Sequence, residues 1–532
     1  MDSIAQTISY SNTGFFSKIA ADYISGNEAL QPFYTHAVNI KGIKAAIEER
    51  KKYPTNRKVL TEVLEKQYAG FSLSPKQKLN IEQLSNDNCF TITTAHQPNI
   101  FTGPLYFIYK ILHAIKLAET FKKEIPENDF VPVYYMGSED ADLDELGHIF
   151  VNGVKYEWKT KQTGAVGRMI VDKELVKLAD AVAGQALVHT HGAAIIDLIK
   201  ACYKEGVTIE QATLQLVNEL FKEYGLLILL PDNAALKRLY IPVVEKELNE
   251  GFSHKAVEAT AATFPKEYKL QASGRELNFF YLKDDRRDRI ELDDAKYKVH
   301  DTATSFTKEE ILTELNTYPE RFSANVILRP VFQEMILPNI AFIGGGGEIA
   351  YWLELKKVFE AVQVPYPMLV LRNSFLIVEK EYSNKAKKLG FSIHDLFTSE
   401  QQLLNEFVKR ESALQLGLGQ EQEAMEGMYE KLKTISGAVD NTLVKHTEAL
   451  KVKAMKRIAL LEKKMLKAEK KKFEAEQRQL HKLKAVLFPN NSLQERTENL
   501  IPLYAKWGSS FIEALYQHSL GLEQQFVILE EA

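Results

Sequence analysis

The sequence predicts an α/β protein with a parallel β-sheet core and a long α-helical antiparallel hairpin near its C-terminus. Over residues 1–398, short β-branched or aromatic runs alternate with helical patterns, which is typical of an α/β fold. Within that region, residues 89–136 read as a strand, a helix and a second strand, the unit from which parallel sheets are built. Residues 402–487 contain no proline and have a polar, helical pattern, which indicates a separate helical domain.

The composition is that of an ordinary globular protein. Of the 532 residues, 45% are hydrophobic and 26% are charged, so no long disordered stretch is expected. The formal net charge of −4 gives the whole molecule no electrostatic reason to bind nucleic acid or a membrane. Residues 1–16 lack the apolar run of a signal peptide, and Leu226–Leu230, the most apolar run, is far shorter than the ~20 residues of a spanning helix. We therefore expect a cytoplasmic protein that binds neither a membrane nor nucleic acid.

The two cysteines, Cys89 and Cys202, exclude two kinds of site. Neither belongs to a Cys-x-x-Cys pair, so a disulfide framework and a cysteine-rich zinc site are both ruled out. Both lie in apolar or mixed surroundings, and we expect reduced, buried thiols.

The βαβ unit begins with a predicted strand over Cys89–Thr94 and ends with a second over Phe130–Met136. Between them, Pro104–Phe121 is predicted to be a helix because apolar residues recur every three or four positions. A right-handed crossover between two parallel strands follows from this order. Further strands are predicted at Leu226–Leu230, Leu277–Leu282, Val326–Leu328 and Met368–Leu371.

Residues 151–321, approximately, are less regular and include the charged run 283–289. We interpret them as one or two insertions into a core that extends over residues 1–398.

The helical arm is predicted over residues 399–488. Its first helix has an apolar seam spaced by three and four, and a second, longer helix follows Asp440. Pro489 ends that helix. Two antiparallel helices would bury the seam, and residues 489–532 would then return to the core. The seam of the first helix consists of Met425, Met428, Leu432, Ile435 and Val439.

The second helix of the arm is strongly basic. Between Lys451 and Lys484 there are eleven Lys and two Arg against four Glu, a net charge of +9. Two interpretations stay open: a solvated helix face balanced by acidic surface elsewhere, or a basic surface for a nucleotide or an RNA backbone.

Polar residues that follow predicted strands are candidates for ligand binding, because an open α/β sheet binds ligands beyond the carboxyl ends of its strands. Residues 94–106 leave a strand and enter a helix whose first amides suit a phosphate or carboxylate. A histidine at this place either packs or takes part in function. The candidates here are His96, Gln97, Asn99, Gly103 and Tyr106.

Residues 137–145 follow the second strand and contain five carboxylates within seven positions, 139–145. Such a cluster repels itself unless it meets Mg²⁺, a substrate amine or the start of the next helix. Helix capping explains some of the acids, and nothing else supports a paired-carboxylate hydrolase. The candidates are Ser138, Glu139, Asp140 and Asp142.

Residues 325–352 contain four consecutive glycines, 344–347, whose amides could approach a ligand closely. This run matches neither dinucleotide nor P-loop spacing. Arg329, beside Pro330, is an unusual place for a charge unless it meets an anion. A weaker signal follows the strand at Met368–Leu371, where a surface turn is the competing interpretation. The candidates from both segments are Arg329, Gly345, Gly346, Glu348, Tyr351, Trp352, Arg372, Asn373 and Ser374.

These segments, in this order, resemble the BshC family of bacillithiol-producing bacteria. The similar stretches are TTAHQPNIFTGPLYFIYK, PVYYMGSEDADLDEL, ILRPVFQEMILP, the glycine loop with GEIAYW, the helical arm and LFPNNSLQERTEN, which together extend over about residues 90–500. Three positions depart from the family pattern. Where relatives usually have a TGQQ-like start, this chain has Thr94-Ala95-His96-Gln97. Ala141 stands where many members have His, and Gly346 replaces a proline. A role carried by a histidine at position 141 cannot apply to this chain.

The resemblance implies a Rossmann-like core related to nucleotidyltransferases and class I aminoacyl-tRNA synthetases, with connecting insertions, an antiparallel coiled-coil domain and a homodimer. It also implies a ligase that adds L-cysteine to glucosaminyl-malate, the last step of bacillithiol biosynthesis.

Amide formation from a free carboxylate is uphill in water, so ATP is expected as the activating substrate, with Mg²⁺ as its companion ion. Whether an acyl-adenylate or an acyl-phosphate forms stays open, as does any metal held by protein groups; no metal-ligating residue is assigned. We expect His96 and Gln97 to hold phosphate or carboxylate and Glu139, Asp140 and Asp142 to hold an amine or Mg²⁺. Anion-stabilising donors and a general base are also needed. The candidates are Arg329 or Arg372 as donors and Glu348 or Asp140 as base.

Two functions from other classes remain as alternatives. The first is an RNA- or nucleotide-binding assembly protein acting through the basic arm, which is weakened because Phe473 is the one aromatic residue between Lys451 and Lys484. The second is a non-catalytic scaffold in thiol metabolism.

Overall fold

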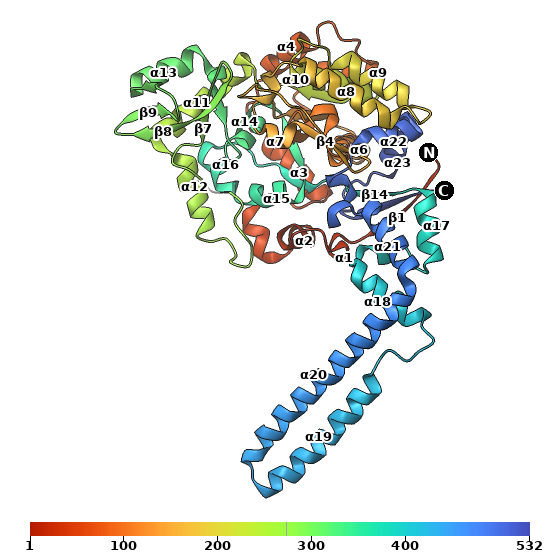
Figure 1. Ribbon diagram of the computed structural model, residues 1–532. Coiled ribbons are helices and arrows are strands. Elements are labelled where there is room, and N and C mark those ends of the chain that lie inside the picture. The colour runs from red at the N-terminus through yellow and green to blue at the C-terminus, as the bar shows by residue number, and fades with distance from the viewer. Residues whose placement is uncertain (273) are drawn as a thin grey trace. The chain divides into compact units, whose positions relative to one another are not determined.

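The computed structural model describes residues 1–272 and 274–532, and the chain divides into two units (Figure 1). The core unit consists of Met1–Leu376 and Ser492–Leu529. The helical unit consists of Ile377–Asn491 and Glu530–Ala532. The core unit is therefore built from two separate stretches of chain.

A parallel sheet with the strand order β13-β12-β2-β3-β6 forms the centre of the core unit. Thr94 of β2 pairs with Tyr134 of β3 on one side and with Ile343 of β12 on the other. Helices on both faces bury such a sheet, which is why its strands read as continuous apolar runs. The strands are β2 (Cys89–His96), β3 (Asp129–Met136), β6 (Leu227–Leu229), β12 (Asn339–Gly344) and β13 (Met368–Leu371).

The predicted βαβ unit is confirmed. Helix α6 (Tyr106–Glu124) connects β2 to β3, and its buried face includes Ala114 and Leu117, which pack in one cluster with Ile92 of β2 and Ile343 of β12. Helix α3 (Ile40–Arg50) contributes Ile43 and Ile47 to the same cluster. The predicted strands at Leu226–Leu230 and Met368–Leu371 correspond to β6 and β13, and Cys89 and Cys202 are free, buried thiols.

The strand expected at Val326–Leu328 is wrong. The Asn325 side-chain oxygen accepts hydrogen bonds from the amides of Ile327 (2.9 Å) and Leu328 (3.4 Å), which fold these residues into a turn. Pro330 then starts helix α14 (Arg329–Ile336). The apolar strand that pairs with β2 is instead β12, further along the chain. The strand expected at Leu277–Leu282 is β7 (Phe279–Lys283), which lies in an antiparallel sheet.

Two groups of elements fill the stretch between β3 and α14. One packs a second hydrophobic cluster, which includes Val182, Ile195 and Leu216 together with Ile501 from the C-terminal stretch. It contains α7 (Leu143–Leu146), β4 (His148–Val151), β5 (Val154–Glu157), the 3₁₀ turn η3 (Val166–Arg168), α8 (Lys173–Ala186), α9 (Gly192–Cys202) and α10 (Ile209–Phe221).

The other group follows β6 with α11 (Ala234–Glu250) and α12 (Phe252–Ala261) and then forms an antiparallel sheet of order β10-β9-β8-β7-β11. Besides β7, its elements are β8 (Arg286–Asp293), β9 (Lys296–Val299), β10 (Ser305–Phe306), α13 (Lys308–Thr317) and β11 (Phe322–Ala324).

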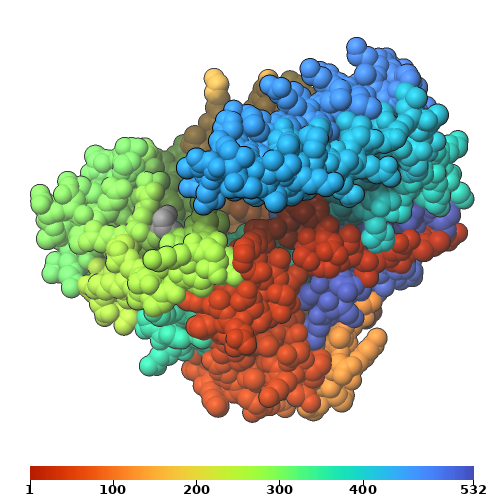
Figure 2. Space-filling model, turned by 90° about the horizontal axis from the view of Figure 1, so that it is seen from below, coloured from red at the N-terminus to blue at the C-terminus, as the bar shows by residue number. Residues whose placement is uncertain are grey.

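The N-terminal residues pack against the segment that follows α12. The rings of Phe33 and Phe264 lie 4.8 Å apart, and the Tyr268 hydroxyl donates to the Asp22 carboxylate at 2.7 Å. In Figure 2 the red N-terminal surface adjoins the yellow-green surface of these residues. The remaining N-terminal elements are β1 (Ser3–Ile8), α1 (Tyr10–Thr13), α2 (Lys18–Ile24), α4 (Arg57–Gln67) and α5 (Pro75–Gln83).

The C-terminal stretch of the core unit holds the loop between β2 and α6 in place. Phe101, Thr102 and Gly103 have positive φ angles of 49°, 74° and 60°. Residues other than glycine rarely adopt this backbone conformation. The Asn499 side-chain amide donates to the carbonyls of Phe101 (2.9 Å) and Gly103 (2.6 Å). Elements α22 (Leu500–Trp507), α23 (Ser509–His518) and β15 (Phe526–Glu531) follow.

The helical unit contains the predicted antiparallel hairpin. Helices α19 (Gly419–Val439) and α20 (Thr442–Lys470) lie side by side and meet near Asp440, as expected (Figure 1). The expectation that they bury the seam of the first helix is wrong, because a hairpin of two helices leaves Ile435 and Val439 63% and 78% exposed and buries no residue of α19. Lys433 donates to Glu448 and Lys451 to Glu430 at 2.7 and 2.8 Å, a pairing that fixes their opposite directions. The predicted single helix after Asp440 is divided by a 3₁₀ turn at Lys471–Phe473. The other helices of this unit are α17 (Lys380–Lys388), α18 (Glu400–Glu411) and α21 (Glu474–Leu487).

Among the helices formed by residues 1–272 and 274–532, none combines the length and the apolar character needed to cross a bilayer.

Candidate functional site

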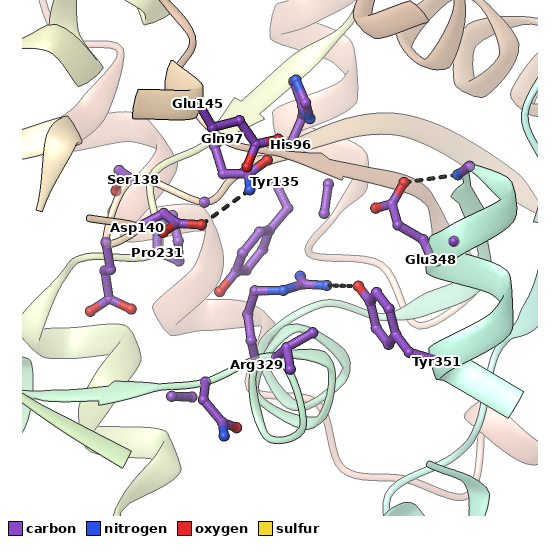
Figure 3. Close-up of a pocket in the computed structure, with 18 of the residues that line it drawn as sticks. His96, Gln97, Tyr135, Ser138, Asp140, Glu145, Pro231, Arg329, Glu348 and Tyr351 are labelled. Atoms are coloured by element: carbon purple, nitrogen blue, oxygen red, sulfur yellow. Dashed lines mark hydrogen bonds between the residues drawn. The ribbon is translucent and has the colours of Figure 1, made fainter. Parts of the chain in front are cut away.

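A cavity of about 630 Å³ opens at the carboxyl ends of β2, β3, β12 and β13 (Figure 3). This is where an open parallel sheet binds ligands, because the loops after adjacent strands converge there. Residues of the antiparallel sheet and of the C-terminal stretch complete its wall. The whole cavity lies within the core unit.

The end of β2 is joined to the end of β3 by hydrogen bonds. The His96 carbonyl accepts from the Gly137 amide at 2.8 Å and from the Tyr134 hydroxyl at 3.0 Å. Both His96 and Gln97 line the cavity. Burial, with the charges of Lys110 and Arg372, holds the pKa of His96 well below its ordinary value, so its ring is neutral. His96 can therefore form hydrogen bonds to a ligand but carries no charge to attract one.

The acidic loop after β3 is fixed by contacts with η3. The amides of Val166 and Gly167 donate to the carbonyls of Asp140 (2.7 Å) and Ser138 (2.9 Å). A methyl group on Gly167 would lie 2.5 Å from the Ser138 β-carbon, so only glycine permits this approach. The loop thus presents Ser138, Glu139 and Asp140 to the cavity in one defined arrangement.

The acids of this loop differ in their partners. Glu139 forms a buried ion pair with Lys237 of α11, which also donates to the Phe322 carbonyl. Asp140 accepts a hydrogen bond from the Gln97 side chain at 3.1 Å, drawn as a dashed line in Figure 3. Asp142 caps α7 by accepting from the Glu145 amide at 3.0 Å and does not line the cavity, whereas Glu145 does.

The glycine loop after β12 is organised by Glu348. Its carboxylate accepts from the Gly345 amide at 2.8 Å and from the Lys110 ammonium at 2.6 Å. Lys110 also donates to the Ala95 carbonyl, which ties this loop to the end of β2. Gly345, Gly346 and Glu348 line the cavity. The acceptor oxygen of Glu348 is therefore engaged by a buried lysine, which leaves it poorly placed to remove a proton.

Two aromatic candidates in α15 (Gly346–Leu353) have different places. Tyr351 lines the cavity, and its hydroxyl accepts from Arg329 at 3.3 Å. Trp352 is completely buried and stacks between Phe342 and Phe359, with ring centroids 4.3 and 5.6 Å away. Trp352 therefore packs the core and does not contact the cavity.

Two arginines on the cavity wall have neutral partners. Arg329 donates to the Gln333 side chain at 3.1 Å and lies over the Tyr135 ring at 5.5 Å. Arg287 donates to Ser323 at 3.0 Å and lies 4.0 Å from the centre of the Phe280 ring. In the described part of the chain, neither guanidinium forms an ion pair with a carboxylate. Burial lowers the pKa of Arg287, yet an arginine stays charged, so both can attract an anion.

Arg372 is committed to a structural contact. Its guanidinium lines the cavity but pairs with Glu495 at 2.7 Å, and it packs over Tyr106, which also lines the cavity. Asn373 and Ser374 turn away from the cavity. The Asn373 side chain donates to the Leu520 carbonyl, and Ser374 accepts from Arg372.

The structure therefore brings most of the sequence candidates together. Those that line the cavity are His96, Gln97, Tyr106, Ser138, Glu139, Asp140, Arg329, Gly345, Gly346, Glu348, Tyr351 and Arg372. Those that lie outside it are Asn99, Gly103, Asp142, Trp352, Asn373 and Ser374.

Sequence reasoning missed the basic residues that the insertion and the C-terminal stretch contribute. These are Arg275, Arg287, Arg289 and Arg496. The charged run 283–289 is evident in the sequence, but strand ends do not predict its place beside the cavity. When the groups that form ion pairs are set aside, the cavity has more cationic than anionic side chains. It therefore favours an anionic ligand.

A protein-bound metal has no ready site. In the two described stretches, 1–272 and 274–532, no group of three or more His, Cys, Asp or Glu side chains is arranged to hold an ion.

Comparisons with known proteins agree with this architecture. The family model described as "Bacillithiol biosynthesis BshC, N-terminal Rossmann-like domain" matches residues 4–373, and "Bacillithiol biosynthesis BshC, C-terminal coiled-coil domain" matches residues 375–531. With the parallel sheet and the helical hairpin, these matches confirm the predicted fold class.

Three relatives are similar along almost their whole length, and each is named "Putative cysteine ligase BshC". The protein of Flavobacterium johnsoniae is 39% identical, over 98% of this chain and 99% of its own. That of Christiangramia forsetii is 39% identical over 98% of each chain, and that of Flavobacterium psychrophilum is 38% identical over 99% of each.

Proposed function

Because the chain belongs to the BshC family of bacillithiol biosynthesis, we propose that it is an ATP-dependent ligase that joins L-cysteine to glucosaminyl-malate. The observation that carries this proposal is the division of charge within the cavity. Arg287 and Arg329 offer cations without carboxylate partners in the described chain, and Asp140 offers an anion. Figure 3 shows Asp140 and Arg329 on opposite sides of Tyr135 in that view. Such a site suits a substrate that carries both carboxylates and an amine.

ATP is the proposed source of the free energy for amide formation. The cysteine carboxylate would attack a phosphorus atom of ATP and displace pyrophosphate from the α-phosphorus or ADP from the γ-phosphorus. The glucosamine nitrogen would then attack the activated carbonyl carbon. The C–N bond forms as the C–O bond to phosphate breaks, so the carboxylate oxygen leaves with the phosphate. Negative charge develops on the carbonyl oxygen and on the oxygen that leaves with the phosphate. Cationic donors stabilise this charge, and the arginines of this cavity are suited to that task.

The contacts refine the roles expected from the sequence. Arg329 and Arg287 are proposed to hold the malate carboxylates or the phosphates. Gln97 and Asp140 are proposed to orient the amine. Arg372 and Glu348, which were expected to act as anion donor and base, are engaged by Glu495 and by Lys110, and we propose positioning roles for them.

Incubation of the purified protein with L-cysteine, glucosaminyl-malate, ATP and Mg²⁺ tests the reaction. Mass spectrometry should detect bacillithiol, and omission of ATP should abolish it. Release of AMP would indicate an acyl-adenylate, and release of ADP an acyl-phosphate. Asp140→Asn should lower the rate, whereas Asp144→Asn on the exposed side of the same loop should not. Failure of the wild type to form bacillithiol under these conditions would contradict the proposal.

The homodimer is also a proposal. Exposed apolar side chains on the hairpin support it, since Ile435 and Val439 of α19 are 63% and 78% exposed and Leu460 of α20 is 53% exposed. Sedimentation of the wild type and of Ile435→Glu would test it. Loss of the dimer in the variant is expected, and a monomeric wild type would contradict the proposal.

The RNA-binding alternative rests on the basic residues of α20 and α21. Part of that charge is neutralised within the hairpin, because Lys451 contacts Glu426, Glu430 and Glu448. Salt-dependent binding of tRNA would support this alternative, and no binding at low salt would remove it.

A further inference from the structure

A partly exposed carboxyl group with a buried oxygen lies behind the acidic loop and does not line the cavity. It belongs to Glu210, in the first turn of α10. Its neighbour is Ser138, which is completely buried and lines the cavity directly after β3. The Gly167 amide of η3 donates to the Ser138 carbonyl at 2.9 Å, and the Ile209 amide of α10 donates at 2.8 Å to the carbonyl of Met169, directly after η3.

Both side chains have polar atoms with unused hydrogen-bonding capacity. The Ser138 hydroxyl oxygen and the Oε2 atom of Glu210 are buried, and neither completes a hydrogen bond within the described chain. They are nevertheless close enough for the Ser138 hydroxyl to lower the pKa of Glu210. Catalytic hydrogen bonds are often long or poorly aligned before substrate binds and then shorten, so this geometry fits a contact that forms in the complex.

The charges around Glu210 leave its proton affinity high. Arg168 is held by Asp232 through two hydrogen bonds of 2.6 and 2.8 Å, and Lys237 is held by Glu139. The pKa of Glu210 is raised to about 7, mainly by burial and also by the charges of Asp232 and Glu139, against the lowering effects of Ser138 and Arg168. An acid with this pKa can both accept and release a proton near neutral pH.

We propose that Glu210 is the proton acceptor of the ligation and that it acts through the hydroxyl of Ser138. This inference rests on the proposed function, since it supplies the base that the amine requires. As the substrate ammonium gives a proton to the Ser138 oxygen, the hydroxyl proton of Ser138 moves to Oε2 of Glu210. The lone pair freed on nitrogen forms the bond to the cysteine carbonyl carbon. The second nitrogen proton leaves with the departing phosphate group, and the serine is unchanged.

Three acids that line the cavity are less suited to this role. Glu139 is bound to Lys237, and Glu348 accepts from Lys110 and the Gly345 amide. Asp140 accepts from the Gln97 side chain and from the Asp142 amide. In each case a hydrogen-bond donor already occupies the carboxylate, which leaves it less free to accept a proton from a substrate.

The test compares the pH dependence of ligation in the wild type with that in Glu210→Gln, Glu210→Asp and Ser138→Ala. The wild-type rate should fall as the pH drops below about 7, because only ionised Glu210 accepts a proton. Glu210→Gln and Ser138→Ala should lose this limb and about 100-fold or more of the rate. Glu210→Asp should recover part of both. Glu219→Gln, an exposed acid on the same helix, is the matched control and should behave as the wild type.

Infrared difference spectra give a readout that does not need turnover. The band of a protonated carboxyl group should titrate near pH 7 in the wild type and in Glu219→Gln, and it should be missing from Glu210→Gln. Product formation with an unchanged acid limb in Glu210→Gln would overturn the relay and leave the proposed function standing. No product from the wild type would overturn both, even if the infrared band titrates as expected.

Discussion

Arg372 and Glu495 form an ion pair of 2.7 Å in the interior of the core unit, with side chains only 4% and 0% exposed. The other oxygen of Glu495 accepts from the Phe375 amide at 3.2 Å, and Arg372 also donates to Ser374 at 2.9 Å. The pair therefore binds the segment after β13 to the C-terminal stretch. Removal of one partner from a buried pair leaves the other charge without compensation.

Glu495→Gln should destabilise the protein by about 3–5 kcal/mol, because it leaves the Arg372 guanidinium buried without its counter-charge. Urea unfolding, followed through the transition of the core unit, would measure the loss of unfolding free energy. Glu513→Gln, on exposed α23 surface, serves as the control and should change the free energy of unfolding by less than about 0.5 kcal/mol. A loss in Glu495→Gln as small as that of the control would show that the pair contributes nothing.

Arg287→Met should weaken binding of glucosaminyl-malate by about 10- to 100-fold, the value of one or two charge-assisted hydrogen bonds. Its thermal stability should stay the same or rise, since burial opposes the charge of Arg287 more strongly than the nearby carboxylates of Glu139 and Asp140 favour it. Calorimetric titration measures the affinity. Arg286→Met, which removes an exposed arginine paired with Asp288, should keep wild-type affinity. If Arg287→Met and Arg286→Met bind glucosaminyl-malate equally well, the carboxylates of this substrate do not contact Arg287.

Gly167→Ala should lower both stability and activity. The added methyl group would lie 2.5 Å from the carbonyl oxygen and the β-carbon of Ser138, so the acidic loop must shift, at a cost of about 1–3 kcal/mol. Gly184→Ala in α8 has free space around the new methyl group and should be neutral or stabilising by about 1 kcal/mol. Thermal unfolding and ligation rates of the two variants decide the matter, and identical behaviour would mean that the loop tolerates the shift.

Glu210→Gln should stabilise the protein at high pH. The folded-state pKa of Glu210, about 7, lies above its ordinary value of 4.5, so ionisation is less favourable in the folded than in the unfolded chain. The resulting penalty grows between these two pH values and is complete above about pH 7, where glutamine removes it. We expect a gain of about 1–3 kcal/mol at about pH 8 and almost none at about pH 4. Melting curves at both pH values measure this difference, and an equal Tm shift at both would contradict it.

The fold could be predicted where local pattern and tertiary role agree. Strands β2, β3 and β13 are apolar runs bounded by polar turns, and the helices of the hairpin follow a polar, helical pattern without proline. The prediction failed at Val326–Leu328 because a side-chain cap from Asn325 folds an apolar run into a turn. Three-residue apolar runs do not distinguish these outcomes.

Arg329 was a candidate although the strand expected before it is a turn. Most other predicted residues of the candidate site follow strands of the central sheet. His96, Asp140 and Gly345 belong to that class. Arg287 and Glu210 do not, since one lies on an inserted sheet and the other on a helix. Their places depend on long-range packing, which spacing along the chain does not reveal. Trp352 shows the opposite case, in which a residue beside the site serves the core.

The clamp formed by Asn499 has a consequence for biosynthesis. On the ribosome, the β2–α6 loop emerges long before its clamp, and the stretch Ile377–Asn491 of the helical unit is translated in between. Because chains grow at about 5–20 residues per second, the nascent core must wait many seconds with this loop unsecured. The ligand cavity therefore reaches its final structure only after the stretch that contains Asn499 leaves the exit tunnel.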